Sequence, residues 1–302
     1  MRLLFNLIRR NLKMYFKDKG LFFSSLITPM LLLVLYATFL AKVYRDNFAS
    51  ALPEEGMTIP ETLLSGTVVS QLVASLLAVS CVTVSFCANL LMIQDKALGS
   101  IRDFTVSPVR RSTLAAGYYI ASACSTLIVT FSALAVCFVY LATQGWYLTV
   151  TDVLLVILDV FMLTLFGTAL SSCVNFFLST NGQASAVGTI VSAGYGFISG
   201  AYMPISVFGE GLQKTLMFLP GTYGTNLLKN HLMRGAFAEM ESIGFPPEIV
   251  ERIRDSVDCN LYFFDHPVPI WVMTVVLVGS VLFFTGLFIL FHVFTRKKQT
   301  RG

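Results

Sequence analysis

The chain has 302 residues, of which 55% are hydrophobic and only 13% are charged. Its mean hydropathy is +0.74, whereas an average soluble domain carries about 25% charged residues. This composition excludes a soluble globular protein and predicts a membrane protein.

The first 19 residues form a basic amphipathic segment. Apolar side chains recur in it at helical spacing (Leu4, Leu7, Ile8, Leu12 and Tyr15), and Lys and Arg occupy many of the other positions. This pattern predicts a helix over 1–19 that lies in the cytoplasmic membrane interface. The helix either anchors the first span only or also contacts a cytoplasmic partner. The apolar run that follows is too long for a signal peptide, so none is expected.

Six apolar stretches follow, and a membrane helix needs about 20 such residues. Polar breaks at 144–147 and 179–182 divide two longer apolar runs. We expect spans near 21–41, 63–93, 114–143, 152–178, 183–206 and 268–294. Uniformly apolar segments of this length indicate helices rather than barrel strands. The predicted fold is therefore an all-α polytopic membrane protein with a single transmembrane domain over 1–302.

The basic residues fix the expected orientation. The termini, the loop 94–113 and the turn near 180 together hold 14 Lys and Arg, and the segments on the opposite side hold 7. Eight acidic residues lie between Glu210 and Asp265 on that opposite side. By the positive-inside rule, both termini are expected in the cytoplasm of a multi-pass plasma membrane protein.

A compact charged loop at 95–111 lies between the second and third spans. It is too short to be a domain, and on the cytoplasmic side it indicates a surface that docks against something. The chain contains no phosphate-binding GxxxxGK[ST] run and no GxGxxG helix start, HExxH or GxSxG motif. We therefore expect no catalytic residue, no metal site and no cofactor bound by this chain, and an energy source outside it.

Asp159 is the only acidic residue well inside a span, where an Asp costs about 2.5–3.5 kcal/mol at the centre. It either makes a structural pair or serves a substrate or ion. A proton relay would need further ionisable residues at similar depth, and none is evident. The three histidines are far apart and lie by different interfaces. Cys259 is the one extracytoplasmic cysteine and has no obvious partner, so neither a disulfide framework nor a metal motif is indicated.

The fifth span carries a small residue at every fourth position, namely Ala184, Gly188, Ser192, Gly196 and Gly200. Such a ladder lets another helix approach closely. It either packs inside the bundle or lines a path.

The segment 207–237 is half apolar and is interrupted at Pro220 and Gly221. Two short helices of this kind predict a re-entrant hairpin. Residues 238–266 predict an extracytoplasmic insert, in which a short amphipathic helix starts at Pro246 and Pro247.

The run from Gly99 to Arg111 resembles the coupling-helix motif of ABC transporter permeases of the type 2 (exporter) family, in which Gly-Thr-Leu is followed by Ser/Thr-Pro-Val and a basic residue. Many members carry an acidic residue two positions before the glycine, where this chain has Ala97. Two further segments are similar to the family's Ser-Gly-x-x-x-Pro stretch and its Pro-x-Thr/Ser-Tyr break. They are Ser199 to Pro204 and Pro220 to Tyr223.

The resemblance implies two permease chains, identical or different, that stand on two cytoplasmic ATPase subunits, which bind ATP and Mg. The residues expected to couple to the ATPase are Asp95, Lys96, Ser100, Arg102, Asp103, Phe104, Ser107, Pro108, Arg110 and Arg111. Substrate is expected to pass between the protomers along the first, second and fifth spans. Gly188, Ser192, Gly196, Gly200 and Asp159 are the candidates for the path or for helix packing, and Pro220, Gly221 and Tyr223 for the re-entrant break.

The function that follows is the membrane subunit of an ATP-driven exporter for a drug-like, peptide or lipid substrate. The alternatives are a polysaccharide or teichoic-acid export permease and, from a different class, a membrane-embedded enzyme or a channel. Membrane lipids are expected around the chain, and nucleic acid is not an expected partner.

Overall fold

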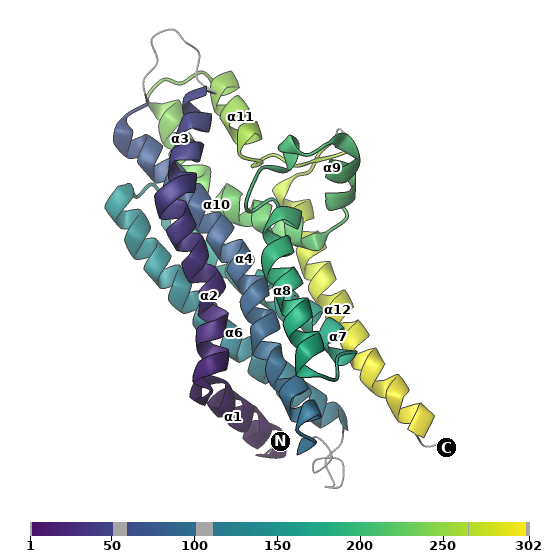
Figure 1. The fold of residues 1–302 in the computed structure, drawn as a ribbon. Coiled ribbons are helices and arrows are strands. Elements are labelled where there is room, and N and C mark those ends of the chain that lie inside the picture. The colour runs from purple at the N-terminus through teal and green to yellow at the C-terminus, as the bar shows by residue number, and fades with distance from the viewer. Residues whose placement is uncertain (1, 51–58, 101–110, 265, 300–302) are drawn as a thin grey trace.

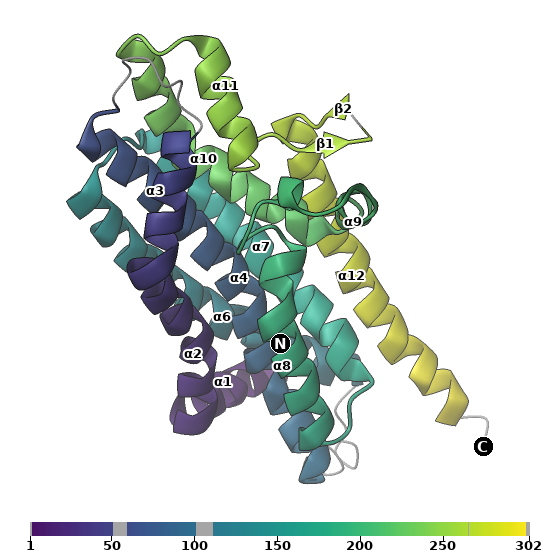
Figure 2. The same ribbon diagram turned by 45° about the horizontal axis from the view of Figure 1, so that its top comes forward.

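The computed structural model describes residues 2–50, 59–100, 111–264 and 266–299, and these are mostly helical. The elements are α1 Arg2–Lys17, α2 Lys19–Leu35, the π-helical turn η1 Tyr36–Leu40, α3 Ala41–Ser50, α4 Glu61–Ala97, α6 Arg111–Gln144, α7 Val150–Phe176, α8 Asn181–Ile198, the 3-10 turn η2 Ile205–Val207, α9 Glu210–Leu216, α10 Pro220–Ser242, α11 Pro247–Ser256, β1 Tyr262–Phe263, β2 His266–Pro267 and α12 Ile270–Gln299. Strands β1 and β2 pair antiparallel. The long helices lie side by side, with α1 at one end of the bundle and α9, α11 and the strands at the other (Figures 1 and 2).

Helix α4 forms the centre of the bundle. It is apolar on all sides, and most of its residues from Leu63 to Asp95 are buried. A helix of this kind is buried either in protein or in lipid, and α4 is buried in protein, because α2, α6, α7, α8 and α10 all pack against it. The approach of α7 depends on Gly167, because a Cβ there would lie 2.9 Å from the carbonyl oxygen of Cys81.

Four helices of the described residues, α4, α6, α7 and α12, are long and apolar enough to cross a membrane. They coincide with the predicted spans 63–93, 114–143, 152–178 and 268–294. The predicted span 21–41 falls on α2, η1 and the start of α3. The predicted span 183–206 is α8, which ends earlier, at Ile198.

The early end of α8 has a local cause. Gly200 adopts φ +70°, the left-handed conformation that glycine tolerates best. The amide of Ala201 then donates to the carbonyl of Gly196 at 2.9 Å, and the amide of Gly200 donates to that of Phe197 at 3.3 Å. These two bonds form a Schellman motif, which satisfies the last carbonyls and stops the helix.

Helix α1 lies across one end of the bundle and packs against α6 (Figure 1). The buried residues of α1 are Leu7, Asn11 and Tyr15, which lie on one face because they are spaced by four. Leu7 approaches so closely that a Cβ at Gly117 would lie 3.2 Å from it. The predicted amphipathic helix is therefore present, and its location at a membrane interface stays a prediction.

The segment predicted as a re-entrant hairpin contains the last residue of η2, the seven-residue α9 and most of α10. Helix α10 begins at the predicted break, at Pro220, but continues past residue 237 to Ser242. The hydroxyl groups of Thr222 and Tyr223 donate to the carbonyls of Leu216 at 3.0 Å and Met217 at 2.6 Å. These bonds hold the turn between α9 and α10. The region 238–266 then holds the end of α10, α11 and the two strands.

Candidate functional site

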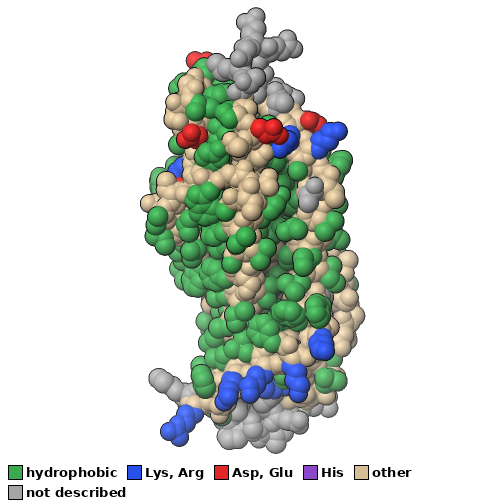
Figure 3. Space-filling view, turned by 90° about the vertical axis from the view of Figure 1, so that its left-hand side faces the viewer, with side chains coloured by type: hydrophobic (Ala, Val, Ile, Leu, Met, Phe, Trp, Pro, Cys, Tyr) green, Lys and Arg blue, Asp and Glu red, His purple; other side chains and the backbone are tan. Residues whose placement is uncertain are grey.

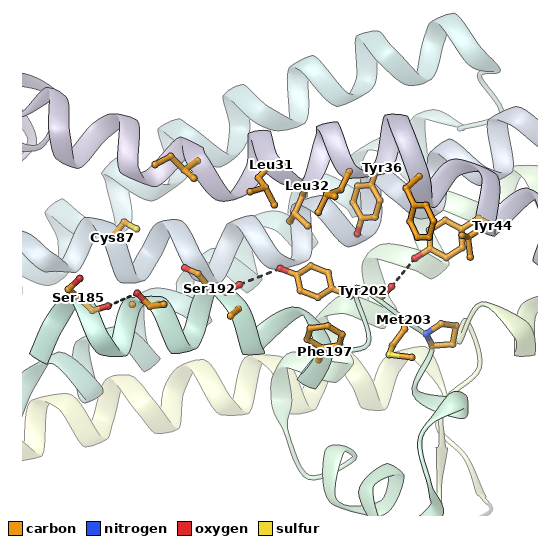
Figure 4. Close-up of a pocket in the computed structure, with 18 of the residues that line it drawn as sticks. Leu31, Leu32, Tyr36, Tyr44, Cys87, Ser185, Ser192, Phe197, Tyr202 and Met203 are labelled. Carbon is orange, nitrogen blue, oxygen red and sulfur yellow. Dashed lines mark hydrogen bonds between the residues drawn. The ribbon is translucent and has the colours of Figure 1, made fainter.

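A groove of about 900 Å³ lies between α8 and the continuous helical segment α2–η1–α3, which we call the first helix. Cys87 and Leu90 of α4 contribute to its wall. Figure 4 shows side chains of the first helix and of α8 facing each other across it. None of the described residues that line it is charged, and most of them are aliphatic or aromatic. The groove therefore suits an apolar, uncharged molecule, because a charged group would lose its water without gaining a partner there.

The predicted small-residue ladder lies partly on this groove. Ala184, Gly188 and Ser192 line it, and a Cβ at Gly188 would meet nothing within 4 Å. Gly196 is covered instead by the ring of Tyr202, because a Cβ there would overlap that ring. Gly200 belongs to the turn that ends α8. Three members of the ladder thus give the groove its width, and the other two shape its end.

Three tyrosines gather at the end of the groove that lies toward α9 and α11. Tyr36 and Tyr44 come from the first helix, and Tyr202 from the turn after α8 (Figure 4). The hydroxyl of Tyr202 donates to the carbonyl of Ser192 at 3.3 Å, so its side chain lies along α8. None of these tyrosines was a sequence-based candidate. Nothing in their spacing distinguishes them from tyrosines that pack at a membrane interface.

At the other end of the bundle, the root of the loop 95–111 is tied to α1. The guanidinium of Arg10 makes two bonds to the Asp95 carboxylate, Nη1 to Oδ2 at 2.7 Å and Nη2 to Oδ1 at 3.1 Å. The hydroxyl of Tyr118 donates to Oδ2 at 2.5 Å. Asp95 is 1% exposed. Its carboxylate is therefore occupied within the chain, although the sequence placed it among the residues that couple to a partner.

Lys96 is also bound within the chain. Its Nζ donates to the carbonyls of Asn175, Phe176 and Leu178 at 3.2, 2.9 and 3.1 Å. These groups belong to the C-terminal end of α7, where a cation also complements the helix dipole. Lys96 thus fixes α4 to the end of α7.

Of the other predicted coupling residues, the structure describes only two. Ser100 is half-buried and Arg111 begins α6. The other candidates, Arg102, Asp103, Phe104, Ser107, Pro108 and Arg110, lie outside the described residues. The described flanks place the two ends of this loop at the same end of the bundle as α1 (Figure 1).

Asp159 has a buried partner. Its Oδ2 lies 2.5 Å from Nδ1 of His231, and both side chains are 8% exposed. One turn further along α10, Nε of Arg234 lies 2.6 Å from Oδ1 of Asp152. The expectation that no ionisable residue shares the depth of Asp159 is therefore wrong. His231 was placed at an interface because sequence alone did not show that α10 continues alongside α7.

Cys259 is buried, and its Sγ lies 3.8 Å from Sδ of Met233. Burial raises the pKa of this thiol to about 12, so it stays protonated and unreactive near neutral pH. Among the described residues, no three His, Cys, Asp or Glu side chains lie together as metal ligands.

The sequence profile of the ABC-2 type transporter family matches residues 2–232. The chain belongs to the ABC-2 type transporter family. The match covers α1 through the first half of α10, and so includes the first helix, α4 and α8, which form the groove. A comparison with curated proteins gives no match. This ABC-2 protein is accordingly a membrane permease subunit of an ABC transporter, and permeases of this family work with ABC ATPase partners.

Proposed function

We propose that this ABC-2 permease exports an apolar, uncharged substrate from the cytoplasm or the inner leaflet. The observation that carries the proposal is the uncharged groove of about 900 Å³ along the first helix, α4 and α8. A polysaccharide would need many hydrogen-bonding groups in its path. The lining hydroxyls of Thr189 and Tyr202 are already donating to backbone carbonyls of α8.

The distribution of charge supports an orientation with both termini in the cytoplasm. One face of the molecule shows a band of Lys and Arg without acidic residues at the end where α1 lies, acidic residues mixed with a few basic ones near the other end, and an apolar belt between them (Figure 3). This is the segregation expected of a protein whose basic end faces the cytoplasm. In this orientation all six predicted segments cross the bilayer, and the groove lies within its thickness.

The loop 95–111 is the proposed contact with the ATPase. Arg10 and Tyr118 hold Asp95, and the carbonyls at the end of α7 hold Lys96. A displacement of the loop would therefore be transmitted to α1, α4, α6 and α7 together. Arg102, Asp103, Phe104, Ser107, Pro108, Arg110 and Arg111 remain the proposed residues that meet the ATPase, in a dimer of permease chains.

The test compares two glycines of α8 that both have open space around a Cβ, Gly188 and Gly194. Only Gly188 lines the groove. In proteoliposomes that contain the permease and its ATPase subunit, Gly188→Leu should abolish most of the ATP hydrolysis stimulated by neutral amphiphiles. Gly194→Leu should preserve it, because both substitutions improve helix propensity equally.

Equal stimulation in the two variants would show that the groove does not carry substrate. Stimulation by anionic as readily as by neutral amphiphiles would refute the proposed substrate class. In the same assay, charge reversal at Arg102 or Asp103 should lower stimulated turnover while membrane insertion stays normal.

A further inference from the structure

The turn between α8 and η2 is bound by side chains from three other segments. Three consecutive carbonyls accept hydrogen bonds from outside the turn: Gly200 from Lys229, Ala201 from Tyr36, and Tyr202 from Tyr44. We call residues 200–206 the outer turn. It closes the end of the groove that lies toward α9 and α11, since Tyr202, Met203 and Pro204 line the groove there. The outer turn is therefore a contact between the groove and the extracytoplasmic insert.

On the side of the insert, charged groups hold the outer turn. Nζ of Lys229 donates to the carbonyl of Gly200 at 2.9 Å and to that of Val257 at 3.0 Å. The carboxylate of Asp258 accepts hydrogen bonds from the amides of Ile205 and Ser206. Lys229 is 2% exposed and Asp258 is 5% exposed, so water competes little with these bonds.

The backbone at Asp258 supports the same interpretation. Asp258 has φ +55°, in the left-handed region that a non-glycine residue occupies only when its surroundings compensate the cost. Its carbonyl accepts a hydrogen bond from the side chain of Asn226 in α10. Together these contacts join the segment 257–258, α10 and the outer turn into one unit.

On the groove side, the bonds to the outer turn are neutral and long. The hydroxyl of Tyr36 lies 3.5 Å from the carbonyl of Ala201, and that of Tyr44 lies 3.4 Å from the carbonyl of Tyr202. Hydroxyl donors prefer 2.5–3.0 Å, roughly, at an oxygen acceptor. Charge-assisted bonds are about twice as strong as neutral ones. The outer turn is thus held more weakly by the first helix than by α10 and Asp258.

The π-helical turn η1 explains why both tyrosines reach the outer turn. In a regular α-helix, residues eight apart differ by about 80° in direction, at about 100° per residue. The amide of Ala41 bonds to the carbonyl of Tyr36, five residues earlier, rather than four. Because the π-helical turn takes up one extra residue, Tyr36 and Tyr44 point in directions that differ about as little as those of residues seven apart in a regular α-helix. Both side chains therefore lie on one face.

We propose that Tyr36 and Tyr44 are positioning residues that hold the outer end of the groove closed, and that the groove opens outward when the first helix separates from the outer turn. Lys229 and Asp258 keep the outer turn on α10 during this movement. The inference rests on the proposed function for its transport role, but the contacts predict an accessibility that needs neither ATP nor substrate.

The test uses a reporter thiol inside the groove, Ser192→Cys in a Cys87→Ala background, in sealed right-side-out vesicles. A membrane-impermeant maleimide is added outside, and the labelling rate is measured well below the melting temperature. The double variant Tyr36→Phe/Tyr44→Phe should label about fivefold faster, which is the effect of losing about 1 kcal/mol of hydrogen bonding. The matched control is Tyr119→Phe, which removes a hydroxyl bond of 3.0 Å to Thr285, between α6 and α12.

Equal labelling rates in the double variant and in the parent would overturn the proposal, because the two hydroxyls would then not control access to the groove. A matching acceleration by Tyr119→Phe would also overturn it, because general loosening would then be the cause. Lys229→Met tests whether the outer turn is held more strongly by α10 than by the first helix. It should lower the melting temperature more than the double variant Tyr36→Phe/Tyr44→Phe does. A failure of Gly188→Leu to affect stimulation would refute the transport path and leave the labelling result unchanged.

Discussion

The bond between Arg10 and Asp95 should stabilise the protein, and its removal can be measured. Arg10→Met leaves a carboxylate that is 1% exposed with only the Tyr118 hydroxyl as a described partner. Breaking a fully buried ion pair costs about 3–5 kcal/mol. The side chain of Arg10 is 31% exposed, so water replaces part of the loss and about 1–3 kcal/mol is expected. By the scaling for domains of 150–250 residues, about 2–4 °C per kcal/mol, the melting temperature should fall by several degrees.

The assay follows unfolding in detergent with a thiol-reactive fluorophore that reports exposure of buried cysteines. A double-mutant cycle with Asp95→Asn isolates the pair, and the loss caused by Arg10→Met should mostly vanish in that background. Arg9→Met is the matched control, because Arg9 is an exposed neighbour on the same helix. An equal loss in the two backgrounds, or the same loss from Arg9→Met, would refute the argument that α1 is tied to the root of the loop 95–111.

Two further predictions concern buried groups. Asp159→Asn and His231→Phe should each lower the melting temperature, and each should reduce the free energy of unfolding by about 1–3 kcal/mol. The double variant should lose less free energy than the sum of the two single losses, and additive losses would show that the two groups are not coupled. Cys259, whose pKa burial raises to about 12 from the ordinary value of 9.0, should resist thiolate-selective reagents from pH 7 to 9 and label fully after denaturation. Since the unfolded thiol ionises first, stability should decline as the pH rises from about 9 toward 12; rapid labelling at pH 8 in the folded protein would contradict this.

The sequence determined the class of the protein, four of its long helices and the amphipathic α1. These follow from composition and from apolar runs, because the bilayer rewards uniform apolarity over about 20 residues whatever the neighbours are. The sequence also predicted a break at Pro220, where α10 begins, and the small-residue face of α8.

The tertiary structure decided which side chains meet. Asp159 and His231 are 72 residues apart, and Arg10 and Asp95 are 85 apart, so no local pattern links them. The end of α8 at Ile198 depends on the left-handed Gly200, whereas the apolar run continues past it. Likewise, only the extra residue in η1 turns Tyr36 and Tyr44 to one face. The sequence thus gives the lengths and polarity of the helices, and the packing around α4 decides which polar groups are paired and where the groove lies.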